Sequence, residues 1–156
     1  MDPRRLATVS NRAARRRAVS VPTARAHAAL YRATKGRLGR GWFGAPVLVL
    51  EVVGRRSGEL RRVPILYARV DSTPVVVAAN AGAPRHPAWW LNLRAAGEAV
   101  VDLRGTRTVV RPRELDGAER DRAWDALVAA YPAAEHYPVF TDRRLPVIAL
   151  GPSPAA

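Results

Sequence analysis

Three apolar segments lie close together near the middle of the chain, at residues 47–53, 61–70 and 74–79. Each has the length and the β-branched content of a strand. Parallel neighbours need a crossover of a dozen or more residues, whereas the connections here are short, with turns at residues 54–58 and 71–73. The segments are therefore predicted to form an antiparallel meander, which argues against a doubly wound parallel sheet.

The remainder of the sequence alternates further strand and helix patterns. Strands are predicted at residues 99–103, 106–112 and 146–150, and helices at residues 24–35 and 88–96 and after Asp116. The last helix presents Trp124, Leu127 and Val128 on one face, with the i, i+3, i+4 spacing of a buried stripe. About six mainly antiparallel strands with three main helices indicate an α+β fold or a β-barrel.

Positive charge is concentrated toward the N-terminus. Residues 1–41 hold 11 of the 26 basic residues but only one of the 13 acidic residues, so they carry +10 of the net charge of +13. We expect a flexible basic arm over residues 1–22, a helix and glycine-rich connector over 23–45, and one folded domain over 46–152. Such an arm favours anionic lipid or nucleic acid. Alternatively, the charge reflects only a biased amino-acid composition, and the arm is solvated and has no specific partner.

Several kinds of site are missing from the sequence. The chain has no cysteine, which excludes disulfides, thiolate metal sites and a cysteine nucleophile. Its three histidines lack metal-ligand spacing. No apolar run approaches the roughly 18 residues of a membrane span, and no apolar segment typical of a secretory signal follows the N-terminal arginines. We therefore expect a cytoplasmic protein that either binds a ligand or takes its chemistry from a cofactor.

The turn between the first two strands is unusually basic. Its arginines are Arg55, Arg56, Arg61 and Arg62. Planar guanidinium groups suit phosphate and carboxylate, and Gly54 and Gly58 allow backbone N–H groups to face an anion. An exposed charged turn and an anion site are both consistent with this pattern.

Two adjacent tryptophans, Trp89 and Trp90, stand at the start of the helix predicted at residues 88–96. Tryptophan rings make good walls for a flat aromatic cofactor. Because adjacent helix positions point in different directions, we predict that one ring is such a wall and the other belongs to the core.

Five motifs occur in the order found in one known family: GRRSG, RRVPILY, HPAWWLNLRA, GAERDRAW and YPxxxxYxxxTDRRLPVIAL. Over roughly residues 46–152, the chain resembles the deazaflavin (F420)-dependent nitroreductases, also described as F420H(2)-dependent quinone reductases. This resemblance implies a split β-barrel of the kind found in FMN-binding proteins. It also implies that the basic turn binds the anionic tail of coenzyme F420, which carries a phosphate and glutamate carboxylates.

The resemblance assigns roles to particular residues. The implied cofactor-binding residues are Arg55, Arg56, Ser57, Arg61 and Arg62 for the tail, Val63, Pro64, Ile65 and Leu66 along the cofactor, and Ala78, Ala79, Asn80, Ala81, Ala88, Trp89, Trp90, Leu91 and Asn92 around its ring and side chain. Tyr131 and Tyr137 match tyrosines that face the substrate, and they are the implied catalytic residues. A purely structural role for either tyrosine is the alternative.

Two departures from the family pattern concern the acceptor. The loop before HPAWW reads Ala79-Asn80-Ala81-Gly82 where the family often has a serine, and Ala134 stands where the nitroreductase prototype has a third tyrosine. The basic turn is intact. The predicted function is therefore hydride transfer from reduced F420 to a small electron-poor acceptor. A quinone or an activated enone is the preferred acceptor, and a nitro compound ranks after them.

Other readings remain open at this point. A split barrel could instead hold FMN or haem, although a single FMN phosphate does not call for four arginines. A nucleic-acid-binding module is disfavoured because the body is near neutral and aromatic residues are not interleaved with the arginines of the arm. The expected partners are a small-molecule acceptor and an anionic membrane surface contacted through the arm. The oligomeric state, with a homodimer as one possibility, is left open.

Overall fold

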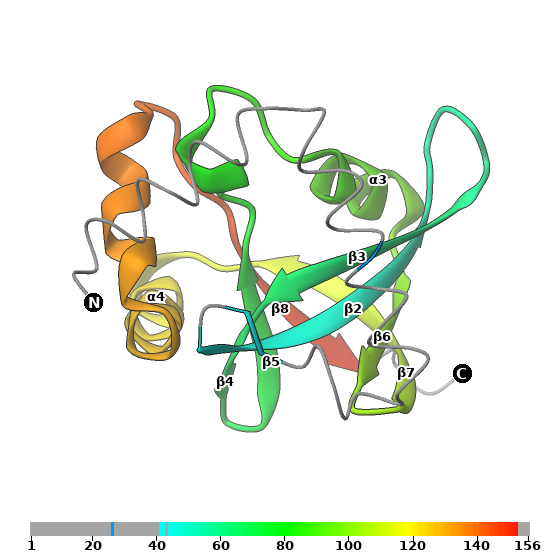
Figure 1. Ribbon diagram of the computed structural model, residues 1–156, viewed down its shortest axis with the longest axis horizontal. Helices are drawn as coiled ribbons and strands as arrows, with labels where there is room; N and C mark the ends of the chain where they lie inside the picture. Colours follow the sequence, from blue (N-terminus) through cyan, green and yellow to red (C-terminus); the bar gives the residue numbers. More distant parts are fainter. Residues whose placement is uncertain (1–25, 27–40, 43, 153–156) are drawn as a thin grey trace.

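The computed structural model describes residues 26, 41–42 and 44–152. The predicted arm over residues 1–22, and the predicted helix over residues 24–35 apart from Ala26, lie outside this part of the chain. Helices and strands carry the labels drawn in Figure 1.

An eight-stranded antiparallel sheet forms the body of the described protein. Its strands are β1 (Gly41–Trp42), β2 (Ala45–Val53), β3 (Leu60–Leu66), β4 (Ala68–Val70), β5 (Thr73–Val77), β6 (Ala99–Leu103), β7 (Thr106–Glu114) and β8 (Val147–Pro152). Hydrogen-bonded neighbours follow the order β1-β2-β6-β7-β8-β5-β4, and β3 also pairs with β2. Figure 1 shows the sheet as strongly curled. The predicted α+β class with antiparallel strands is confirmed.

The predicted strand over residues 61–70 is divided in two. β3 pairs with β2 as far as Leu66, whereas β4 starts at Ala68 and pairs with β5. Tyr67, between them, is buried in the core, and its N–H donates to the carbonyl of Pro46 at 3.2 Å. The predicted antiparallel neighbours are therefore observed, but the middle strand of the meander is divided at Tyr67: its first half pairs with β2 and its second half with β5.

Strand β6 has its predicted bounds, whereas other strands differ from the prediction at their ends. The segment predicted at 106–112 continues to Glu114, and the last strand ends at Pro152. The short strand β1 was not predicted, because the glycines around it were interpreted only as breaks. Such shifts of a few residues arise where sheet pairing, rather than local composition, decides where a strand ends.

The helical elements are α3 (Ala88–Ala96), α4 (Gly117–Ala130) and the 3-10 segments η1 (Asn80–Gly82) and η2 (Pro132–Phe140). Helix α3 ends as predicted, at a left-handed Gly97 with φ of 75°. The carboxylate of Asp116 accepts from the N–H of Gly117 at 2.8 Å where α4 begins. In Figure 1, α3 lies beside the β2–β3 hairpin, and α4 and η2 lie together on the other side of the molecule.

Buried side chains from both faces of the sheet hold these elements in place. Trp90 and Leu93 of α3 pack into the barrel core, and Ala123 and Leu127 of α4 pack into a second apolar cluster. Burial of one leucine side chain stabilises a fold by about 2 kcal/mol. The predicted buried face of α4 is confirmed at Leu127. Packing therefore fixes α3 against the barrel next to the basic turn.

Candidate functional site

The basic turn is a tight connection between β2 and β3. The N–H of Gly54 donates to the carbonyl of Glu59, and the N–H of Gly58 donates to the carbonyl of Gly54, each at 2.8 Å. Gly58 has φ of +69°, and a Cβ on Gly54 would lie 2.8 Å from Ser57 Oγ. Both glycines are therefore required by the turn, which holds its arginines on a short, ordered frame.

Helix α3 is tied directly to this turn through a buried amide. Asn92 Oδ1 accepts from the N–H of Arg55 at 3.2 Å and from Arg55 Nη1 at 2.8 Å. Asn92 is only 7% exposed. This bond is part-buried, and hydrogen bonds to a charged group are among the stronger ones in proteins. The bond therefore orients Arg55 relative to α3.

Register places Arg61 and Arg62 on opposite faces of the β2–β3 pair. Arg61 lies opposite Val52, a barrel-core residue, whereas Arg62 lies opposite Glu51. Successive strand residues point to opposite faces, so only Arg61 shares the face of the barrel core, into which α3 also packs. The four arginines do not form one cluster.

Each of these two arginines already has an acidic partner. Arg61 Nη2 lies 2.9 Å from a Glu59 carboxylate oxygen, and it donates to Ser57 Oγ at 3.2 Å. Arg62 Nε donates at 3.3 Å to Glu51, a buried carboxylate that Arg107 also contacts. The Arg61 pair is exposed and therefore weak, whereas the charge of buried Glu51 needs its partners.

Arg56 completes the basic turn. Its side chain is exposed, and it makes no hydrogen bond or ion pair to another residue in the described part of the chain. The structure thus brings Arg55, Arg56, Ser57 and Arg61 together at the turn, and it places Arg62 in a different ion-pair network.

The predicted cofactor-lining residues of β3 and α3 flank the turn. Val63 and Ile65 pack with the barrel core, and Leu66 packs against a separate apolar cluster. Pro64 is buried, Ala88 is exposed and Leu91 is half-buried. Residues 63–66 are all apolar in sequence. Because strand residues alternate, Val63 and Ile65 lie on one face of β3, and Pro64 and Leu66 lie on the other.

The tryptophan pair divides as the helix geometry predicts. Trp90 is 3% exposed and belongs to the barrel core, whereas Trp89 is half-buried at the edge of the same cluster. The ring centroids are 6.3 Å apart in an edge-to-face arrangement. The prediction of one core tryptophan is confirmed. That Trp89 forms a cofactor wall stays a prediction.

The loop after β5 contains an unusual backbone. Ala78 and Ala79 are buried, and the next three residues, Asn80, Ala81 and Gly82, all have positive φ, of 48°, 51° and 75°. A non-glycine residue in this region is strained, and it persists only where surrounding contacts hold it. A Cβ on Gly82 would lie 2.7 Å from Phe140 Cβ, so the loop also packs tightly on η2.

Arg143 supplies the contacts that hold this loop. Its Nη2 donates to the carbonyl of Ala79 at 2.6 Å, its Nη1 to that of Ala78 at 3.2 Å, and its Nε to that of Ala83 at 2.9 Å. Nη1 also lies 3.2 Å from His86 Nδ1. Desolvation by burial, together with the charges of Arg143 and Arg94, lowers the pKa of His86 and favours the neutral imidazole as acceptor.

Sequence reasoning did not assign Arg143 a role. Its partners at the loop lie 57 to 65 residues away in the chain. The one signal in the sequence is its place in the TDRRLPVIAL motif, four residues before the buried strand β8. We regard Arg143 as a positioning residue for the loop over residues 78–86.

The two tyrosines meet part of this loop in one apolar cluster. Tyr131 and Tyr137 are 4% and 6% exposed, with ring centroids 6.4 Å apart. The cluster also contains Leu66, Ala79 and Ala81. Residues predicted to frame the cofactor and to face the acceptor, distant in sequence, are therefore in contact with one another. Whether the tyrosines touch an acceptor stays a prediction.

The described residues lack two further kinds of feature. They contain no group of three or more His, Asp or Glu side chains that could hold a metal ion. None of their helices is long and apolar enough to cross a membrane.

A family model and similar known proteins indicate the same family for this chain. The model of the F420H(2)-dependent quinone reductase family matches residues 23–152. The chain is 31% identical over 138 residues to the F420H(2)-dependent quinone reductase Rv1261c of Mycobacterium tuberculosis (strain ATCC 25618 / H37Rv), an alignment covering 86% of this chain and 93% of the relative.

Two solved structures are also similar. An F420-H2 dependent reductase (FDR-A) is 32% identical, with a TM-score of 0.62 over 67% of this chain and 93% of its own. A structure described as a domain-swapped dimer is 29% identical, with a TM-score of 0.64 over 83% of this chain and 98% of its own. These similarities confirm the predicted split-barrel fold.

Proposed function

The chain belongs to the F420H(2)-dependent quinone reductase family, and from this premise we propose that it reduces a quinone or an activated enone. Membership makes it an oxidoreductase whose cofactor is coenzyme F420. The identity of the acceptor is our proposal. The FMN and haem alternatives are not favoured, because both the family model and the relatives name F420.

The observation that carries the assignment of the cofactor site is the ordered basic turn beside α3. Arg55, Arg56 and Arg61 supply guanidinium donors, and Ser57 supplies a hydroxyl, within one short segment. A tail with a phosphate and several carboxylates matches several cations better than one phosphate does. The residues present therefore fit the anionic tail of F420.

We assign different roles to the arginines than the sequence alone suggested. Arg55, positioned by Asn92, and Arg61, whose exposed partner Glu59 is easily displaced, bind the tail. Arg62 neutralises buried Glu51 from the other face of the sheet. Exchanging the weak Glu59 contact for a phosphate costs little, because exposed ion pairs contribute about 0–1 kcal/mol.

The reactive end of the cofactor is proposed to lie along α3 and the loop held by Arg143. When bound, reduced F420 supplies a hydride to the acceptor. The chain's part is to bind, orient and exclude water. Trp89 flanks the ring, and the strained backbone at Asn80 and Ala81 sets the position of the loop. Tyr131 or Tyr137 donates a hydrogen bond or a proton to the acceptor.

A nitro compound is the less favoured acceptor. The loop has no hydroxyl at Ala79 or Ala81, and Ala134, buried beside the tyrosines, replaces a third phenol. A quinone or enone needs a hydrogen-bond donor at one oxygen, and two tyrosines can supply it. Steady-state rates with a quinone, an enone and a nitroimidazole, at equal concentrations, test this order.

The decisive measurement for the proposed function is cofactor preference. We expect the protein to bind F420 more tightly than FMN, because several arginines at the turn match the multiply charged tail. Quenching of deazaflavin or flavin fluorescence on titration with protein measures both affinities. Binding of FMN as tight as that of F420 would contradict the assignment.

The basic arm is expected to have no part in cofactor binding. Deleting residues 1–22 should leave F420 affinity nearly unchanged, because the family motifs start near residue 46. It should weaken binding to anionic vesicles, since each basic residue near such a surface contributes about 1 kcal/mol. Vesicle sedimentation and F420 titration of both proteins measure the two effects. Loss of F420 binding on deletion would place the arm in the site.

Location and assembly form the remaining part of the proposal. A cytoplasmic enzyme with peripheral contact to an anionic membrane, made by the basic arm, agrees with the charge distribution. A homodimer is suggested because a similar solved structure is described as a domain-swapped dimer. Light scattering of the purified protein gives its oligomeric state.

A further inference from the structure

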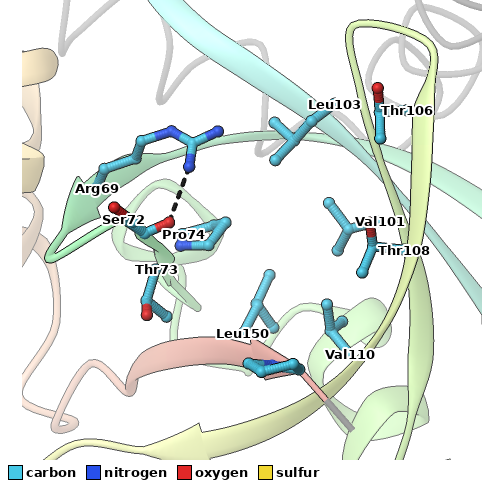
Figure 2. Close-up of a pocket in the computed structure, with 11 residues that line it drawn as sticks. Arg69, Ser72, Thr73, Pro74, Val101, Leu103, Thr106, Thr108, Val110 and Leu150 are labelled. Carbon is cyan, nitrogen blue, oxygen red and sulfur yellow. Dashed lines mark hydrogen bonds between the residues drawn. The ribbon is translucent and has the colours of Figure 1, made fainter.

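A cavity opens at the side of the barrel where two β-hairpins face each other. Its volume is about 530 Å³, within the range of about 300–1,000 Å³ that is typical of small-molecule sites. The lining residues are Arg69, Ser72, Thr73, Pro74, Val101, Leu103, Thr106, Thr108, Val110, Leu150 and Pro152. They come from the β4–β5 hairpin, the β6–β7 hairpin and strand β8 (Figure 2).

This cavity is separate from the basic turn. The turn follows Val53 at the end of β2, whereas β6 pairs with β2 so that Asp102 lies opposite Val49. The β6–β7 turn therefore lies toward the beginning of β2, at least four residues, or about 13 Å, from its basic end. None of the residues predicted to bind F420 lines the cavity.

The interior of the cavity is apolar. Val101, Val110 and Leu150, which are 2–4% exposed, belong to the barrel core, and Leu103 packs against it. Figure 2 shows these four side chains directed toward the cavity from β6, β7 and β8. The core side chains thus form the apolar floor of a cavity that is open to solvent, and this floor would contact the apolar part of a ligand.

The rim of the cavity carries an oriented cation. Arg69 Nη1 donates to the carbonyl of Ser72 at 2.8 Å, and the guanidinium carbon lies 5.9 Å from the centroid of the Tyr67 ring. A guanidinium has five N–H donors, and this is its one hydrogen bond to the residues that the structure describes. Asp71 is the acid on the β4–β5 turn.

We propose that this cavity is a second binding site, for a small molecule with an apolar body and one carboxylate. The core side chains contact the body, and Arg69 binds the carboxylate with the donors that Ser72 does not use. Thr73, Thr106 and Thr108 also line the cavity and add hydroxyl groups to it. The combination of an apolar hollow with one fixed cation selects for an amphipathic acid over a neutral compound of equal size.

Octanoate and octan-1-ol test the proposal as a matched charged and neutral pair. Isothermal titration should detect octanoate binding to the full chain. Arg69→Gln should weaken octanoate binding roughly tenfold, because one charge-assisted contact is lost, and should change octanol binding less than about twofold. Thr108→Trp, which fills the cavity from an exposed strand position, should weaken binding of both compounds.

The matched control is Arg111→Gln, an exposed arginine of β7 that does not line the cavity. It should bind octanoate as the wild type does, and all three variants should keep the wild-type unfolding temperature and F420 affinity. Three results would overturn the proposal: no octanoate binding at millimolar concentration, equal octanoate affinity for wild type and Arg69→Gln, or displacement of octanoate by F420. The last result would place octanoate at the basic turn.

Discussion

Arg61→Ala is expected to weaken F420 binding by about 10- to 100-fold. A hydrogen bond to a charged group is worth about 1.5–3 kcal/mol, and every 1.4 kcal/mol changes affinity about tenfold. Arg61→Lys should recover only part of the loss, since an ammonium cannot form the two parallel bonds of a guanidinium. Isothermal titration at two ionic strengths measures the effect, which should be larger at low salt because screening is weaker there.

The neighbouring residues provide sharp controls for this prediction. Arg62→Ala should leave F420 affinity nearly unchanged and lower the unfolding temperature, because Arg62 faces buried Glu51. Arg111→Ala, on β7, should affect neither quantity. Glu59→Gln should strengthen binding, because it removes the carboxylate that competes for Arg61. Wild-type affinity in Arg61→Ala would show that this arginine is only a solvated turn residue.

Replacing Arg143 with methionine is expected to destabilise the protein by about 3 kcal/mol. The variant leaves the carbonyls of Ala78, Ala79 and Ala83 without their guanidinium donor, and an unsatisfied buried acceptor costs about 1–3 kcal/mol. The total is set at the lower end of the simple sum because Ala79 keeps a hydrogen bond from the N–H of Gly82, the loop relaxes and water replaces part of the donor. Urea unfolding measures the loss.

A second measurement separates positioning from general stability. At a temperature where the variant is fully folded, hydrogen exchange should accelerate at residues 78–86, and F420 affinity should fall. Arg143→Lys should restore part of the stability, since one ammonium cannot reach three carbonyls. Arg144→Met is the adjacent control: Arg144 pairs with exposed Asp116 and should leave both stability and affinity nearly unchanged. Unaltered exchange in the loop of Arg143→Met would contradict the assigned role.

Local sequence patterns predicted the elements of the site well. The helix over residues 88–96 was found with its predicted bounds, because Gly97 provides a left-handed end that other residues adopt poorly. The split between Trp89 and Trp90 follows from helix geometry alone. The motif order over residues 46–152 identified the family, and with it the cofactor.

The different roles of the arginines could be assigned only from the strand register. Strand alternation predicts that Arg61 and Arg62 face opposite sides, but it does not say which side carries α3 and which carries Glu51. Pairing of Val52 with Arg61 decides this. The sequence interpretation therefore counted four arginines at one site, whereas Arg62 belongs to a different ion-pair network.

The sequence by itself determined the approximate places of most strands, turns and main helices, the placement of positive charge, and the family, with its cofactor, to which the chain belongs. Only the tertiary structure decided that the chain bends at Tyr67, that Asn92 orients Arg55, and that Arg143 holds a strained loop some 60 residues away. Patterns with a period of 2 or 3.6 report which face of an element is buried. These patterns carry no information about which distant element covers that face. The covering element is selected by packing and hydrogen bonding in the folded chain.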